Sequence, residues 1–232
     1  MDIDTTLRNY PLNCESAEQI VRQIADVEID DKISFVIKKT EEIMEDSEYQ
    51  GVRLSLDAYL DKTRIPLKID ISTGDVITPC EISFSYQLMF ENRTIPLLAY
   101  PPETVLAEKL ETILSRGEAN TRLRDFYDVY ILQREDFVVT PDALRYALLA
   151  TCRTRGHEDL LHTYASILDG VRQSGAMRTQ WMKYQTDFDY AAGITWDTVL
   201  DTVETLCMKT LDDHAFGDEL PQEESQFEMH LL

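Results

Sequence analysis

The chain has 232 residues, 44% of them hydrophobic, which is enough to form a sizeable core in one large domain or one and a half. It carries 43 acidic and 22 basic residues, a net charge of -21, which argues against a protein that coats nucleic acid. No basic and apolar leader opens the chain, and no apolar run approaches the roughly 18 residues of a membrane span, so we expect a cytoplasmic protein without a membrane partner.

The first hundred residues predict a sheet with at least one helix. Residues 15–28 place apolar side chains at helical spacing, and the short apolar run 32–39 is typical of a strand. Three further segments alternate apolar and polar residues with period two: 52–60, 65–71 and 81–88. This alternation predicts strands with one face packed on a core.

The second half of the chain predicts a bundle of helices. The predicted helices are 103–117, 121–135, 140–156, 157–174 and 195–211. The pattern indicates an α+β protein with a sheet domain over 1–100, a helical domain over 101–211 and an acidic, disordered tail over 212–232. Residues 116–183 are close to neutral, so a polyanionic partner would approach the chain there.

The opening segment "MDIDTTL" places two aspartates one residue apart. In a strand, Asp2 and Asp4 project on the same face, where two carboxylates repel unless a cation lies between them. Asp70, on the polar face of the predicted strand 65–71, joins them if that strand neighbours residues 1–7. Three aspartates on neighbouring strands can bind two Mg²⁺ ions that clamp a triphosphate. The spacing alone favours ordinary solvent-facing acids, because a bare D-x-D pattern is common, and both interpretations stay open.

Lys109 interrupts the apolar face of the predicted helix 103–117, since apolar residues lie four positions before and after it. A buried ammonium needs an anionic partner unless it extends to the surface. The next predicted helix supplies Asp125 and Asp128, which are neighbours on one helical face. Lys109 could form an interhelical ion pair or contact a bound phosphate, and its position allows both.

The segment "ETVLAEKLETILSRGEANTRLRDFYDVYIL" (103–132) resembles the hallmark of the AbiEii/AbiGii-type nucleotidyltransferase toxins of bacterial abortive-infection systems. In that family an A-E-K-L helix is followed by an R-D-x-Y-D-L/V-Y helix. "DIDTTL" (2–7) and "LKIDIS" (67–72) fall in the family's order, so the resemblance covers roughly residues 1–135. It implies a nucleotidyltransferase-like mixed sheet with helices, followed by a helical C-terminal region.

The resemblance also implies a function. The chemistry of the family is Mg²⁺-dependent transfer of a nucleotide from an NTP to an acceptor, with tRNA as the acceptor in some members. The expected setting is a toxin–antitoxin system of phage defence, and the expected partners are the NTP, tRNA or another RNA, and a cognate antitoxin.

Particular residues match the family's functional positions. Three match its metal ligands: Asp2, Asp4 and Asp70. Asp70 would also help to deprotonate the acceptor hydroxyl, and Lys109 would contact the nucleotide's phosphates. Asp125 and Asp128 match the catalytic acids of the last motif, and we favour Asp128 as the essential one.

One feature departs from the family pattern. Family members carry a Gly-Gly-Ser/Thr element and an arginine ahead of the D-x-D pattern, and this element cradles the triphosphate through backbone N–H groups. Here only Met1 precedes Asp2, so we expect a truncated chain that lacks the first strand and helix and binds triphosphate weakly. The alternative hypothesis is a degenerate, catalytically inactive nucleotidyltransferase-like protein with only a binding role. A different D-x-D enzyme, such as a nucleotide-sugar transferase, explains neither Lys109 nor "RDFYDVY".

Overall fold

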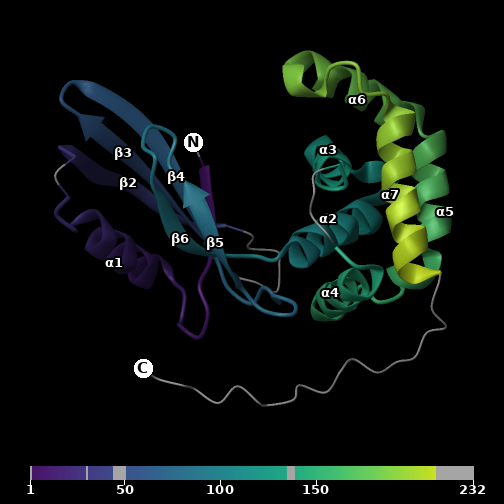
Figure 1. Ribbon diagram of the computed structural model, residues 1–232, viewed down its shortest axis with the longest axis horizontal. Coiled ribbons are helices and arrows are strands. Elements are labelled where there is room, and N and C mark those ends of the chain that lie inside the picture. The colour runs from purple at the N-terminus through teal and green to yellow at the C-terminus, as the bar shows by residue number, and fades with distance from the viewer. Residues whose placement is uncertain (1, 30, 44–50, 135–138, 213–232) are drawn as a thin grey trace. The chain divides into compact units, whose positions relative to one another are not determined.

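The computed structural model describes residues 2–29, 31–43, 51–134 and 139–212. The chain divides into two compact units, Met1–Asp75 and Val76–Leu232. The first, here called the sheet unit, contains a four-stranded sheet and a helix (Figure 1). The second, the helical unit, contains a two-stranded sheet followed by helices. This combination confirms the predicted α+β class.

The sheet unit is built on a mixed sheet with the strand order β1-β4-β3-β2. Its strands are β1 (Asp2–Thr6), β2 (Ile33–Ile43), β3 (Gly51–Leu60) and β4 (Thr63–Ser72). β1 runs parallel to β4, and the other pairs are antiparallel. The predicted strand 65–71 therefore does neighbour the opening segment.

The alternation of apolar and polar residues gives this sheet one packed face and one polar face. On β3 the apolar set is buried: Val52, Leu54, Leu56 and Ala58. On β4, Ile71 is buried, and Ile69 and Leu67 pack against the same cluster. Because side chains alternate along a strand, Asp4 of β1 and the charged residues of β3 and β4 emerge on the opposite face.

Helix α1 (Cys14–Ala25) covers the packed face. Asn13 caps it, since its Oδ1 accepts a hydrogen bond from the Ser16 backbone at 2.8 Å. Ala17 and Val21 are buried, as the helical spacing predicts, whereas Ile24 is 67% exposed. The apolar stripe of α1 thus continues one turn beyond the residues that pack in the core.

The helical unit opens with the hairpin of β5 (Ile82–Gln87) and β6 (Thr94–Ala99). Its helices are α2 (Pro102–Arg116), η1 (Gly117–Ala119), α3 (Leu123–Leu132), α4 (Pro141–Thr154), α5 (Leu160–Gln173), α6 (Gly175–Asp187), η2 (Asp189–Ala191) and α7 (Trp196–Leu211). One continuous core joins them, and its largest fully buried side chains include Trp181 and Phe126. No described helix has the length and apolarity needed to cross a membrane.

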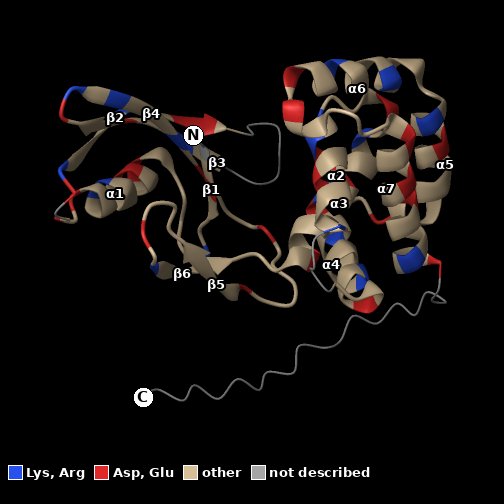
Figure 2. Cartoon of the chain, turned by 45° about the horizontal axis from the view of Figure 1, so that its top comes forward, with Lys and Arg blue, Asp and Glu red and all other residues tan. Residues whose placement is uncertain are grey.

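Ion pairs tie the outer helices of this unit together. Figure 2 shows acidic and basic segments interspersed over α5, α6 and α7. Arg172 on α5 donates to Asp201 at 2.7 Å and to Glu204 at 2.6 Å, both on α7. Arg178 on α6 donates to Asp197 at 2.7 Å. Part of the charge of the C-terminal half therefore serves to join helices to one another.

Several sequence expectations differ from this fold. The alternating residues of 81–88 do form a strand, but Phe84 is 47% exposed and Tyr86 45% exposed, because β5 pairs only with β6 among the described strands and no core forms beneath it. The units divide after Asp75, whereas the sequence placed the boundary at residue 100. β6 and α6 were not predicted. The expected tail lies, apart from residue 212, outside the described residues.

Candidate functional site

Two of the predicted metal ligands lie side by side on the polar face of the sheet unit. Asp4 on β1 and Asp70 on β4 are partners in the parallel register, so their side chains emerge on the same face. Asp4 is exposed and Asp70 is half-buried. Asp2 lies in register with Lys68, one same-face position earlier, but its side chain falls outside the described part of the chain.

Arg53 extends this row onto β3, where it is the antiparallel partner of Asp70. Its Nε donates to Asp70 Oδ1 at 2.7 Å and its Nη2 to Oδ2 at 2.6 Å. This two-pronged geometry fixes the plane of the carboxylate and balances its charge. A cation that binds Asp70 must therefore share the carboxylate with Arg53, a residue that the sequence did not single out.

The carboxylates on this face are suitable ligands for Mg²⁺. Two carboxylates that are register partners on adjacent strands offer the oxygen ligands that Mg²⁺ prefers. Among the residues whose positions are described, no group of three or more His, Cys, Asp or Glu side chains is placed to hold a metal. Mg²⁺ commonly binds through one or two carboxylates together with substrate phosphates. Asp4 and Asp70 therefore supply a pair of donors that fits Mg²⁺ bound together with a nucleotide.

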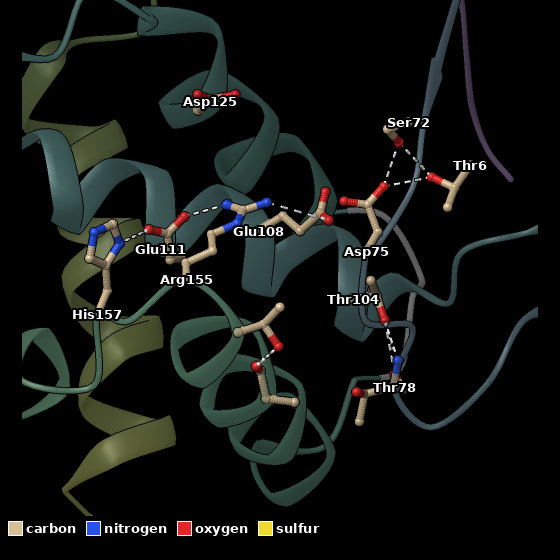
Figure 3. A network of polar contacts seen from close by, with 12 residues as sticks. Thr6, Ser72, Asp75, Thr78, Thr104, Glu108, Glu111, Asp125, Arg155 and His157 are labelled. Carbon is tan, nitrogen blue, oxygen red and sulfur yellow. Dashed lines mark hydrogen bonds and ion pairs between the residues drawn. The ribbon is translucent and has the colours of Figure 1, made fainter. Parts of the chain in front are cut away.

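Hydroxyl groups continue the polar face toward the carboxyl ends of β1 and β4. Thr6 and Ser72 form the next same-face register pair after the two aspartates. Both hydroxyls donate to Asp75 Oδ2, each at 2.6 Å, as Figure 3 shows. Carboxylate and hydroxyl oxygens thus line the ends of the two parallel strands.

The second set of predicted residues meets in the helical unit, between α2 and α3. Lys109 Nζ donates to Asp128 Oδ2 at 2.6 Å and lies 3.5 Å from Asp125 Oδ1. The lysine side chain is 21% exposed and that of Asp128 is 28% exposed, while Asp125 is 1% exposed. The interhelical ion pair that the sequence allowed is therefore present. It does not exclude phosphate binding, because Lys109 and Asp128 both retain solvent access.

Asp125 and Asp128 have different surroundings. Arg122 donates to Asp125 Oδ1 at 3.2 Å, and its Nε lies 2.8 Å from Oδ2. Asp125 is thus enclosed between two cations and away from solvent, whereas Asp128 meets only Lys109 among the ion pairs of the described residues. Of the two acids, Asp128 is the one that a substrate can reach.

The turn between α2 and α3 places these side chains opposite one another. Gly117 ends α2 with a φ of 48°, a value that glycine adopts without strain. The buried Asn120 then accepts a hydrogen bond from the Arg122 backbone through Oδ1 at 2.7 Å, which fixes the start of α3. Apolar residues of both helices, among them Leu110 and Phe126, pack in the core and hold the helices together.

A second polar cluster on α2 was missed by the sequence analysis. Glu111 is buried, and it accepts a hydrogen bond from Arg155 and pairs with His157 Nδ1 at 2.7 Å. Arg155 Nη2 also lies 3.6 Å from Glu108 Oε1, so it joins two acids of the "AEKLE" segment (Figure 3). This cluster anchors the helix of Lys109 to the end of α4. The acids at 108 and 111 were visible in the sequence, but their distant partners were not.

The structure thus groups the predicted residues in two sets. Asp4 and Asp70 form one set in the sheet unit, and Lys109, Asp125 and Asp128 form the other in the helical unit. That both sets surround one nucleotide stays a prediction, as do the individual roles of these residues.

Comparisons with known proteins place the chain in a family. The family described as "Nucleotidyl transferase AbiEii toxin, Type IV TA system" matches residues 1–202. A crystal structure of a "putative nucleotidyltransferase from H. pylori" aligns with a TM-score of 0.41 and 14% identity, over 93% of this chain and 81% of that chain. No curated protein matches. Because the family match spans most of the sequence, the chain belongs to the AbiEii nucleotidyl transferase toxin family of type IV toxin–antitoxin systems.

Proposed function

We propose that this protein is a toxin that transfers a nucleotide from an NTP to an acceptor hydroxyl in the presence of Mg²⁺, with pyrophosphate as the leaving group. The observation that carries the proposal is the register of Asp4 with Asp70, which brings two carboxylates together on one polar face of a family member. Two carboxylates of this kind would hold Mg²⁺ together with the phosphates of a bound nucleotide.

The residues of the sheet unit would hold the ion and move a proton. Asp4 and Asp70 would coordinate Mg²⁺, and Asp2 would complete the set. The bound ion would neutralise phosphate charge and favour an ionised acceptor hydroxyl. Asp70 would accept the proton from that hydroxyl, and Arg53 would orient the Asp70 carboxylate through the two hydrogen bonds described above.

The residues of the helical unit would bind the phosphates. A triphosphate would compete with Asp128 for the Lys109 ammonium, which the 2.6 Å contact holds at a partly exposed position. Asp128 is the acid that we propose as essential, because Asp125 is enclosed by Arg122 and Lys109 and serves to position the lysine. The acceptor would be tRNA or another RNA, and a cognate antitoxin would be the protein partner.

Label transfer tests the proposal. The full chain is incubated with each α-labelled NTP, Mg²⁺ and total RNA, and the label is followed into RNA. Asp4→Asn and Asp70→Asn should lose at least about a hundredfold in rate, as expected when a metal ligand is lost. Asp61→Asn is the matched control, since Asp61 is exposed at the turn between β3 and β4.

Two results would contradict the proposal or part of it. Full transfer by Asp4→Asn would show that the metal-site assignment is wrong. No transfer by the wild-type chain with any NTP, together with a cooperative melt, would favour the inactive, binding-only alternative.

A further inference from the structure

Three aromatic side chains form a partly exposed patch at the junction of α3 and η2, here called the aromatic ledge: Tyr127, Phe188 and Tyr190. The rings of Phe188 and Tyr190 lie 5.4 Å apart and those of Tyr127 and Tyr190 lie 4.8 Å apart. Phe188 is 41% exposed and Tyr190 is 51% exposed. Single exposed aromatic residues are common, but a contiguous group of them indicates a binding surface.

The ledge rests on a rigid base. The hydroxyls of Tyr184 and Tyr190 form a hydrogen bond with 2.9 Å between the oxygens. The ring of Tyr184 stacks on buried Trp181, with 5.3 Å between the ring centroids. Trp181 Nε1 in turn donates to the Ile194 carbonyl at 2.8 Å. Burial raises the pKa of Tyr184, so its hydroxyl stays protonated and keeps this contact at neutral pH. A platform fixed in this way loses little conformational entropy when a ligand binds.

The ledge begins next to the proposed phosphate site. Tyr127 directly precedes Asp128, which binds Lys109 Nζ. Burial, the neighbouring Tyr190 and the Asp128 carboxylate all raise the pKa of Tyr127 above its usual value. Within the helical unit, the consecutive residues Tyr127 and Asp128 therefore connect the ring of Tyr190 with the Lys109 ammonium.

The charges around the ledge decide which part of a nucleotide it suits. Asp187 and Asp189 flank Phe188 and are both exposed, so they disfavour a phosphate on the rings. The planar, uncharged face of a nucleobase meets no such repulsion and stacks on aromatic side chains. A nucleotide with its phosphates at Lys109 and its base on the ledge satisfies both constraints.

We propose that Phe188 and Tyr190 stack the base of the NTP whose phosphates Lys109 binds. This inference rests on the proposed function and adds the base-binding surface to it. Stacking favours no particular base strongly, because every base presents a π face, so the ledge should contribute to the affinity for all four NTPs.

Binding measurements on the full chain separate the ledge from the phosphate site. Wild type, Phe188→Ala and Tyr190→Ala are titrated with ATP and with inorganic tripolyphosphate, both with Mg²⁺, by calorimetry. Each variant should bind ATP about tenfold more weakly and bind tripolyphosphate unchanged, because only ATP carries a base. Tyr146→Ala, which removes a 37% exposed tyrosine on α4, is the matched control and should change neither affinity.

The outcomes distinguish the two proposals. A variant whose affinities for ATP and tripolyphosphate fall equally, or whose affinity for ATP does not fall, would overturn the inference that the ledge stacks the base. Either result would leave the proposed nucleotide site intact. Failure of the wild type to bind either ligand would refute the proposed function itself, and the ledge with it. Phe188→Leu guards against misfolding, since it keeps apolar bulk and removes the π face; ATP affinity equal to wild type would also overturn the inference.

Discussion

Substitution of Lys109 by methionine gives the sharpest test of the polar site between α2 and α3. Methionine keeps the aliphatic stem and removes the ammonium, which leaves the 1% exposed Asp125 with Arg122 as its remaining cation in the described site. Removing one partner of a buried charge group costs about 3 kcal/mol of unfolding free energy. Asp128→Asn deletes only the 2.6 Å contact between partly exposed groups, and a charge-assisted hydrogen bond of that kind contributes about 1.5 kcal/mol.

We therefore expect Lys109→Met to lower the unfolding free energy by clearly more than Asp128→Asn does. The two tryptophans of the chain, Trp181 and Trp196, both lie in the core of the helical unit, so their fluorescence in a urea titration reports that unit. Equal effects of the two variants, within about 0.5 kcal/mol, would refute the reasoning that Asp125 depends on Lys109. Transfer activity would be lost in both variants under the proposed function.

Further expectations concern other parts of the molecule. Arg53→Gln should release the Asp70 carboxylate and lower the Mg²⁺ concentration that gives half-maximal transfer. An unchanged Mg²⁺ concentration at half-maximal transfer would contradict the inference that Arg53 competes with Mg²⁺ for this carboxylate. Glu111→Ala should lower the unfolding free energy by about 2 kcal/mol, measured by urea titration, because it removes the hydrogen bonds of a buried carboxylate with Arg155 and His157. Burial raises the pKa of Cys152 and Cys207 to about 12 from a usual value of 9.0. The unfolded chain therefore releases these protons first, so stability should fall as the pH rises from about 9 toward 12, by about 1.4 kcal/mol per pH unit and thiol. Cys152→Ala should weaken this slope in melts at successive pH values, and an unaltered slope would contradict it.

Strong periodicity made most of the fold predictable. β3 and β4 alternate without interruption, so both their existence and their packed face followed from the sequence. α6 was missed although Met177, Trp181 and Tyr184 are buried at helical spacing, because the rest of that helix is polar. β6 was missed because Pro96 lowers its strand propensity, and only its pairing with β5 reveals it.

Part of the site was predictable from spacing along the chain. The i, i+3 acids on α3 followed from helical spacing, and the lysine on α2 stood out among apolar residues. Arg53 could not be paired with Asp70, because their contact depends on the register of a hairpin whose two-residue turn leaves Asp61 at a φ of 51°. Glu111 and His157 are likewise joined by tertiary packing across 46 positions.

The place of β1 in the sheet affects how Asp4 variants must be interpreted. β1 is an outer strand of the four-stranded sheet, and outer strands can pair with strands of other molecules and seed aggregates. An exposed carboxylate on such a strand repels a second copy, so we expect Asp4 to oppose self-association in addition to any catalytic role. A neutral substitution removes that protection, and the resulting oligomers would lower activity without any change in chemistry. Light scattering on each variant separates a colloidal defect from a lost ligand.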